Sequence, residues 1–284
     1  MIRVNGKTRI YGAVGVNRHD NPSGLWFQLS STNSDSKDKV KRDIFQTMTT
    51  ELLYLNNPYS TQCESKATFV EFTDLVVDRS MFVPSIDGQP NDKGEVVING
   101  KKYPIIDTWW DGKWVHLMSH DTYPQDIVGQ TVYQNIDWEL RHIHMRFRTA
   151  LFILAGIAFR DYGAGTRINE TYDDHAWIDV IADEITEEMV KTLESKANSF
   201  VAQKLEVTNR VLSKKEFEEN PSLMAFSKGK VPDKENTRVC EIGDLPLQPD
   251  MGTQVKNTGE IGNIAIKTSL VKGKINKRLT ITLS

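Results

Sequence analysis

Cysteine and long apolar runs are both scarce in this sequence of 284 residues. Cys63 and Cys240 lie far apart and lack CxxC or CxxxH spacing, so we expect neither a disulfide framework nor a cysteine-based zinc module. The longest apolar run, Ala150–Phe159, is about half of the ~20 residues that a membrane helix needs. The N-terminus, MIRVNGKTRI, has no apolar signal segment. We therefore expect a cytoplasmic protein that does not enter a membrane.

A strong excess of either charge is absent as well. The 35 Lys and Arg residues against 38 Asp and Glu residues give a net charge of −3, so any contact with RNA must rest on a local basic patch. The hydrophobic fraction is 39%, and six Trp, eleven Phe and eight Tyr residues can bury a substantial core. This composition excludes disorder along the whole chain.

Apolar and polar residues alternate through much of the first half of the chain, for example over residues 67–83, ATFVEFTDLVVDRSMFV. Such alternation is typical of strands with one buried face. The dipeptides Asn99-Gly100 and Asp111-Gly112 favour tight hairpin turns, because these residue types tolerate a positive φ. The pattern predicts a small β unit that resembles a barrel.

The periodicity changes after residue 137. Residues 138–163 predict a long helix whose second half is apolar on nearly all sides, as expected for a buried helix. AWIDVIADE predicts a strand, and Thr186 is the expected N-cap of a second helix with two glutamates in its first turn. Strands return near the end. The predicted class is α+β, a small barrel-like domain followed by an antiparallel sheet with two long helices on one face.

These changes predict three parts of the chain. Residues 1–48 form an extension of unknown role, residues 49–137 the barrel-like domain, and residues 138–284 the α+β domain. Within the last part, a capping-box match at Ser213 begins a short helix that Pro221 is expected to stop.

Three segments carry a resemblance to a known family. They are DRSMFVPSIDGQPND at residues 78–92, IDWELRHIHMRFRTALFIL at residues 136–154, and VCEIGDLPLQPDMGTQVKNTGEIG at residues 239–262. Together they resemble the stand-alone alanyl-tRNA editing proteins of the AlaX type, relatives of the editing domain of alanyl-tRNA synthetase. The resemblance extends roughly over residues 49–284. It implies the fold of that editing domain and, as partner, an aminoacyl-tRNA or an amino-acid-derived small molecule.

The resemblance also implies a zinc ion, which in the family supports cleavage of the ester between a mischarged amino acid and tRNA. The family holds zinc with two His four residues apart on a helix, and with a Cys and a His four residues apart in a loop. Here the helical pair falls on Arg148 and Phe152, and the loop pair on Asp250 and Gln254. An arginine has only donors and a phenylalanine has no ligand atom. We therefore expect no zinc at this position.

A guanidinium is a plausible substitute for the missing cation. We expect Arg148 to form a buried pair with Asp250, with Gln254 as a further acceptor and Phe152 filling the vacated volume. His144 lies one helical turn before Arg148 and is the nearest candidate base.

The loop segment supplies the remaining candidates. Ser80 stands where the family has Thr in its DRT motif, and Gly88 and Gln89 match the family's GQP motif, so all three are expected to contact substrate. Ile86 and Asp87 stand where the family has glycines, and they should narrow or stiffen the pocket.

Three functions remain open at this point. The protein is a zinc-free hydrolase or transferase of aminoacyl esters, with Arg148 stabilising the oxyanion and His144 or Asp250 as the base. Alternatively it is a non-catalytic pseudo-enzyme that binds aminoacyl-tRNA, or a family member redirected to small-molecule biosynthesis, in which Arg148 binds a carboxylate. The fold cannot choose among them, because function depends on the site.

Overall fold

The computed structural model describes residues 3–4, 7–8, 49–182, 184–270 and 277–284. Contacts between residues divide the chain into Met1–Thr47 and Met48–Ser284. In the first unit, β1 (Arg3–Val4) and β2 (Lys7–Thr8) pair antiparallel, and the rest of the predicted extension over residues 1–48 lies outside the described residues. The proposed domain limits at residues 48 and 137 stay predictions.

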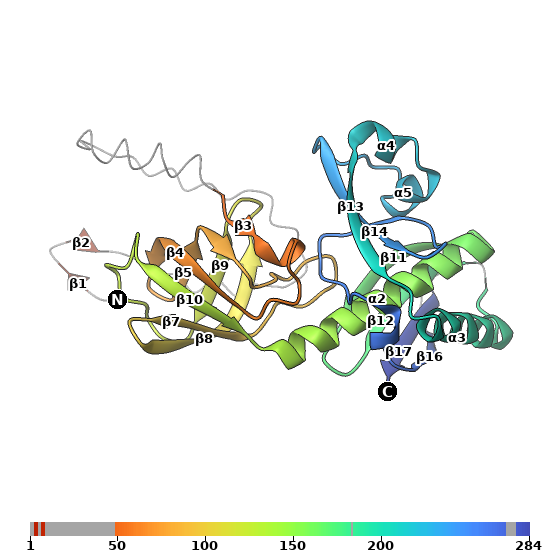
Figure 1. Ribbon diagram of the computed structural model, residues 1–284, viewed down its shortest axis with the longest axis horizontal. Coiled ribbons are helices and arrows are strands. Elements are labelled where there is room, and N and C mark those ends of the chain that lie inside the picture. The colour runs from red at the N-terminus through yellow and green to blue at the C-terminus, as the bar shows by residue number, and fades with distance from the viewer. Residues whose placement is uncertain (1–2, 5–6, 9–48, 183, 271–276) are drawn as a thin grey trace. The chain divides into compact units, whose positions relative to one another are not determined.

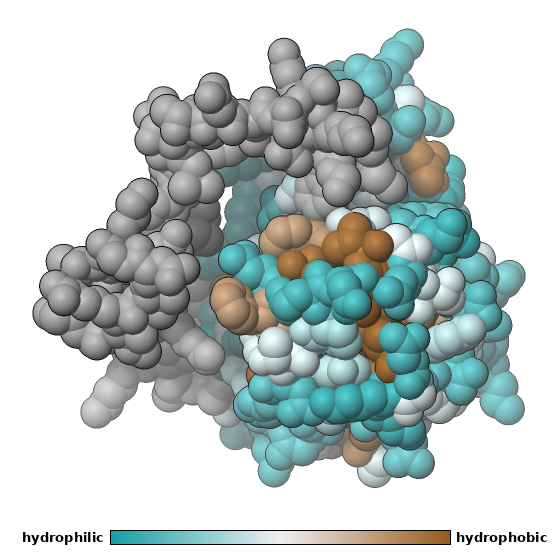
Figure 2. Space-filling model, turned by 90° about the vertical axis from the view of Figure 1, so that its left-hand side faces the viewer, coloured by the Kyte–Doolittle hydropathy of each residue, from teal (hydrophilic) through white to brown (hydrophobic). Residues whose placement is uncertain are grey.

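Six antiparallel strands form a closed barrel in the order β10-β4-β5-β9-β8-β7 (Figure 1). Their bounds are β4 Gln62–Glu71, β5 Asp74–Val77, β7 Gly94–Ile98, β8 Lys101–Trp110, β9 Val115–Ser119 and β10 Thr131–Ile136. The turn between β7 and β8 has Asn99 and Gly100 at φ 50° and 81°, as the sequence predicts. The face of the barrel turned to the viewer in Figure 2 is mostly hydrophilic, with hydrophobic side chains only in small groups.

The second half is built on the long helix α2 (Trp138–Tyr162). Asp137 caps its start by accepting a hydrogen bond from the Leu140 N–H, and Gly163 ends it at φ 63°. The helix packs on a four-stranded sheet of order β11-β12-β17-β16, with bounds Gly165–Thr171, Ala176–Ile181, Lys277–Leu283 and Ile264–Leu270. Helix α3 (Glu187–Ala202), capped by Thr186, contacts both α2 and β16. The α+β prediction is confirmed.

A smaller antiparallel sheet lies beside α2, made of β13 (Val207–Ser213), β14 (Asn236–Ile242) and β15 (Gln248–Pro249). The predicted capping box at Ser213 is present and begins α4 (Lys214–Glu218). Pro221 differs from the prediction, because it is the first residue of a further helix, α5 (Pro221–Phe226). A proline suits that position, since the first turn of a helix needs no N–H donor.

Four short elements complete the described fold. Strands β3 (Glu51–Leu52) and β6 (Arg79–Ser80) pair in parallel, a single 3₁₀ turn covers Leu53–Leu55, and another covers Thr258–Glu260. Among the described residues, no helix is both long enough and apolar enough to span a bilayer.

Candidate functional site

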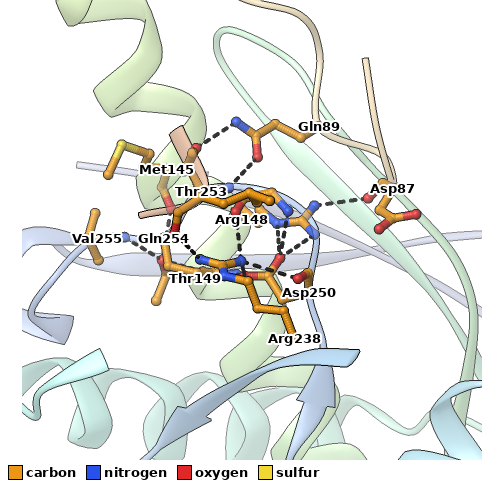
Figure 3. A network of polar contacts seen from close by, with 12 residues as sticks. Asp87, Gln89, Met145, Arg148, Thr149, Arg238, Asp250, Thr253, Gln254 and Val255 are labelled. Atoms are coloured by element: carbon orange, nitrogen blue, oxygen red, sulfur yellow. Dashed lines mark hydrogen bonds and ion pairs between the residues drawn. The ribbon is translucent and has the colours of Figure 1, made fainter. Parts of the chain in front are cut away.

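Helix α2 and the loop after β15 meet at a buried ion pair (Figure 3). Arg148 donates to Asp250 Oδ1 from Nε at 3.0 Å and from Nη2 at 2.7 Å. The side chains are 3% and 0% exposed. The pair expected from the sequence is therefore present and is shielded from water.

A second arginine, which the sequence reasoning missed, shares the same carboxylate. Arg238 lies on β14 and donates from Nη1 to Asp250 Oδ2 at 3.0 Å and to the Gly252 carbonyl at 3.1 Å. The loop is held against β14 because the Asp250 N–H donates to the Arg238 carbonyl at 3.1 Å. The sequence gives no spacing pattern that predicts Arg238, because its partner Asp250 lies across a loop and not one turn along a helix.

This cluster of Arg148, Arg238 and Asp250 carries two positive charges and one negative charge. Burial alone would raise the pKa of the Asp250 carboxyl, but the charges of Arg148 and Arg238 outweigh burial and hold that pKa below its ordinary value. Asp250 is therefore ionised at neutral pH, and the cluster keeps one uncompensated positive charge.

The other two positions at which the family has zinc ligands lie around this cluster. The Gln254 amide donates to Asp250 Oδ2 at 3.3 Å, and its Oε1 lies 2.7 Å from Thr149 Oγ1. The guanidinium carbon of Arg148 lies 5.1 Å from the centre of the Phe152 ring, a cation–π contact.

A zinc ion does not fit this set of donors. Both oxygens of Asp250 already accept hydrogen bonds from guanidinium groups, and the amide oxygen of Gln254 faces Thr149. Arg148 and Phe152 offer no lone pair. Within the described ranges, no group of three or more His, Cys, Asp and Glu side chains is placed to hold a metal.

The loop from the barrel reaches the cluster through a tight turn. Ile86 and Gln89 exchange backbone hydrogen bonds of 3.0 and 2.8 Å, and between them Asp87 and Gly88 have φ of 47° and 77°. Positive φ at both central residues is typical of a type I′ turn, for which Asp-Gly is a strong signal that our reading of the sequence overlooked. The Asp87 carbonyl accepts from Arg148 Nη1 at 3.0 Å.

Glycine is required at the second position of this turn. The Gly88 carbonyl accepts from the Thr171 N–H at 2.8 Å, and a Cβ on Gly88 would lie 2.3 Å from the backbone oxygen of Asn169. The loop is thus pressed against β11, and Gly88 serves this close approach.

Gln89 holds the barrel loop to the loop of the second half. Its Nε2 donates to Thr253 Oγ1 at 2.8 Å, and its Oε1 accepts from the Thr253 N–H at 3.0 Å. The amide is therefore engaged at both ends by protein atoms. Ser80 is fully buried beside Gln134 in the barrel and does not line the pocket described below. The substrate contacts expected of Ser80 and Gln89 stay predictions.

His144 pairs with Asp173 and has no hydrogen bond to Arg148, Arg238 or Asp250. Its Nε2 lies 2.8 Å from Asp173 Oδ1, and its Nδ1 is buried without a hydrogen-bond partner among the residues that the structure describes. The imidazole is 1% exposed, whereas the Asp173 carboxylate is 73% exposed. Helical spacing placed His144 near Arg148, but the structure pairs it with the turn after β11.

A pocket of about 360 Å³ lies beside Arg148. One face of α2 lines it with Arg148, Leu151, Phe152 and Ala155, whose spacing puts them on the same side of the helix. Opposite this face the lining includes Asp87, Arg167, Ile178, Phe217 and Phe226. Two of the four family zinc positions, Arg148 and Phe152, thus line a pocket whose walls carry both polar and apolar side chains.

The barrel, the helix-backed antiparallel sheet and the buried polar cluster are consistent with the editing-domain fold that the sequence resemblance implies. Residues 237–280 match the family described as the threonyl and alanyl tRNA synthetase second additional domain. The chain is 31% identical over 247 residues to the alanyl-tRNA editing protein AlaX-M of Methanosarcina mazei, covering 82% of this chain and 96% of that protein. AlaX-M of Methanosarcina barkeri is similar at 31% identity over 245 residues, covering 82% of this chain and 99% of that protein.

The alanine–tRNA ligase of Saccharolobus islandicus is 30% identical over 253 residues, which are 84% of this chain and 27% of that enzyme. That match covers a part of the ligase only. The identities to the AlaX-M proteins extend over nearly their whole length. The chain belongs to the family of AlaX-type alanyl-tRNA editing proteins.

Proposed function

We propose that this protein binds an aminoacyl group, carried by tRNA or by a small amino-acid derivative, without zinc-dependent hydrolysis. The observation that supports the proposal most is the position of the Asp250 carboxylate between Arg148 and Arg238. The family membership supports an aminoacyl ligand, because the relatives are named alanyl-tRNA editing proteins.

The residues around the pocket favour binding over hydrolysis. A zinc ion lowers the pKa of bound water from about 15.7 to about 7, and a guanidinium supplies no such hydroxide. Asp250 is a poor base because its pKa is lowered and both of its oxygens accept hydrogen bonds. Of the described residues that line the pocket, none is a histidine. A cytoplasmic location, where aminoacyl-tRNA is available, is part of the proposal.

The second candidate is slow, zinc-free hydrolysis with His144 as the base. One observation favours it, namely the buried Nδ1 of His144 that lacks a partner while Asp173 orients the ring. A redirected role in small-molecule biosynthesis uses the same pocket, with Arg148 binding a carboxylate in place of an ester.

Metal content, binding and turnover of the purified full chain test the proposal together. We expect less than stoichiometric zinc, measurable binding of alanyl-, seryl- or glycyl-tRNA, and deacylation no faster than in buffer. Arg148→Met should weaken binding. Arg146→Ala is the matched control, because Arg146 lies on the same helix but donates to the Ile261 carbonyl, away from the pocket.

Two results would contradict the proposal. Stoichiometric zinc with fast, chelator-sensitive deacylation would restore ordinary metal-dependent editing. Absence of binding to every aminoacyl compound would remove the aminoacyl ligand itself. Chelator-resistant deacylation that is lost in His144→Gln would instead support the second candidate.

A further inference from the structure

We infer that the pocket beside Arg148 selects a large apolar amino acid, with the α-ammonium group on Asp87 and the carboxyl or ester oxygens towards Arg148. This inference rests on the proposed function, since it names which aminoacyl group the site takes. The size of the pocket, the chemistry of its walls and the charges at one end support it.

The pocket is larger than a small side chain requires. Its volume of about 360 Å³ compares with roughly 150 Å³ for an engineered cavity that binds benzene. Small-molecule sites begin at about 300 Å³. A methyl or hydroxymethyl side chain would leave most of this pocket to water, whereas a phenyl or branched aliphatic side chain with its α-carbon would occupy a larger share of it.

Polar and apolar side chains both line the pocket, and the apolar ones can bury a large side chain of a ligand. Leu151, Phe152 and Ala155 form the α2 side, and Ile178 from β12 and Phe226 from α5 also line the pocket. Apolar surface that leaves water on both partners supplies binding energy.

Arg148 marks the end of the pocket that is suited to the carboxyl group. Its guanidinium has five N–H groups and donates three hydrogen bonds, two to Asp250 and one to the Asp87 carbonyl. Two N–H groups remain for a ligand. Because Arg148 and Arg238 share one carboxylate, the surplus positive charge attracts a ligand oxygen that carries negative or partial negative charge.

Asp87 places a carboxylate at the same end. Figure 3 shows its carbonyl turned towards Arg148 and its carboxylate turned away from that contact. The side chain is exposed, it lines the pocket, and its carboxylate has no hydrogen-bond or ion-pair partner among the residues that the structure describes. An α-amino acid carries its ammonium and carboxyl groups on one carbon, which matches the anion of Asp87 and the cation of Arg148 beside the apolar side chains of this pocket.

Isothermal titration of the full chain tests this inference. The probes are L-phenylalanine, L-leucine, L-alanine and L-serine, each as free acid and as methyl ester, with phenylalanyl- and alanyl-tRNA as the macromolecular pair. We expect the two large side chains to bind roughly tenfold or more tightly than the two small ones. The ester and tRNA arms distinguish a free amino acid from an aminoacyl ester.

Asp87→Asn tests the ammonium contact. Asn tolerates the positive φ of residue 87, so the turn should be kept, and affinity should fall by roughly 10- to 100-fold. Glu170→Gln is the matched control, because Glu170 is also an exposed acid beside the turn but does not line this pocket. 3-Phenylpropionate, which lacks the ammonium, should bind weakly to the wild type and be insensitive to Asp87→Asn.

The two proposals fail in different ways. Equal affinity for large and small amino acids, or tight binding of 3-phenylpropionate, would overturn the inference and leave aminoacyl binding intact. Failure of all amino acids, esters and charged tRNAs to bind would overturn the proposed function together with the inference.

Discussion

Two buried arginine–aspartate contacts lie seven residues apart on helix α2, on the same face, and they differ in charge balance. Arg141 pairs with Asp92 of the barrel, and Arg148 pairs with Asp250 of the second half. Both guanidinium groups are almost completely buried. Their surroundings differ, because one contact is closed on all sides and the other lies at a pocket.

The Arg141 contact is balanced and closed. Its Nε and Nη2 donate to the two oxygens of Asp92, and other N–H groups donate to the Pro58 and Met81 carbonyls at 3.0 and 2.8 Å. Asp92 also accepts from the Val83 N–H at 2.7 Å. One positive and one negative charge cancel, and Arg141 lines none of the pockets described. This contact joins the barrel to α2.

The Arg148 contact is unbalanced and lies at a pocket. Arg148 and Arg238 bind different oxygens of Asp250, so removing one arginine leaves a neutral pair, whereas removing the carboxylate leaves two buried cations. Arg238 also donates to the Gly252 and Leu55 carbonyls, so part of its role is structural. The surplus positive charge beside the pocket is the feature that the proposed ligand would use.

The most destabilising change should be Arg141→Met. It leaves the Asp92 carboxylate buried and unpaired, which costs about 3–5 kcal/mol of unfolding free energy. Urea denaturation of the full chain measures it. A loss below about 1 kcal/mol would mean that Asp92 finds water or another donor, and the link would not be structural.

Asp250→Asn should follow, with a cost of about 2–3 kcal/mol at pH 7, because two guanidinium groups lose their carboxylate. Its effect should depend on pH. The folded pKa of Asp250 lies below the ordinary value of about 3.9, so the carboxylate stabilises the folded state above about pH 4 and loses that effect as the pH falls through the folded pKa. The difference between wild type and variant should shrink in acid, and a constant difference would contradict the charge argument.

Gly252→Ala should cost about 1–3 kcal/mol, because its Cβ would lie 2.4 Å from Arg148 Nε and 2.4 Å from Gln89 Oε1. The variant should also weaken ligand binding by displacing Arg148. Gly100→Ala is the control that adds a Cβ without crowding, because nothing lies within 4 Å of the added atom. If Gly252→Ala and Gly100→Ala bound the ligand with equal affinity, a displacement of Arg148 would have no effect on binding.

Arg148→Met should have the smallest effect on stability, about 1 kcal/mol, because Asp250 keeps Arg238, the Gly252 N–H and Gln254. Thermal unfolding of Arg148→Met and Arg141→Met, measured side by side, compares the two contacts directly. The same variant should lose ligand affinity, whereas a cost equal to that of Arg141→Met would make both contacts structural.

Much of the fold was readable from the chain alone. Alternation and Asn99-Gly100 predicted the barrel hairpin, Thr186 and Ser213 predicted helix starts, and the apolar second half of α2 predicted a buried helix. These features depend on neighbours within a few residues, where local propensity and periodicity act.

The side-chain contacts within the site could be predicted only in part from the sequence. Arg148 and Asp250 could be paired because family motifs align their positions, but nothing along the chain joins Arg238 to Asp250, or His144 to Asp173. The Asp87-Gly88 turn had a local signal, whereas its docking on Arg148 and Thr171 did not. Contacts between elements depend on how sheets and loops pack in space, so the surplus charge and the pocket beside it form only once the chain is folded.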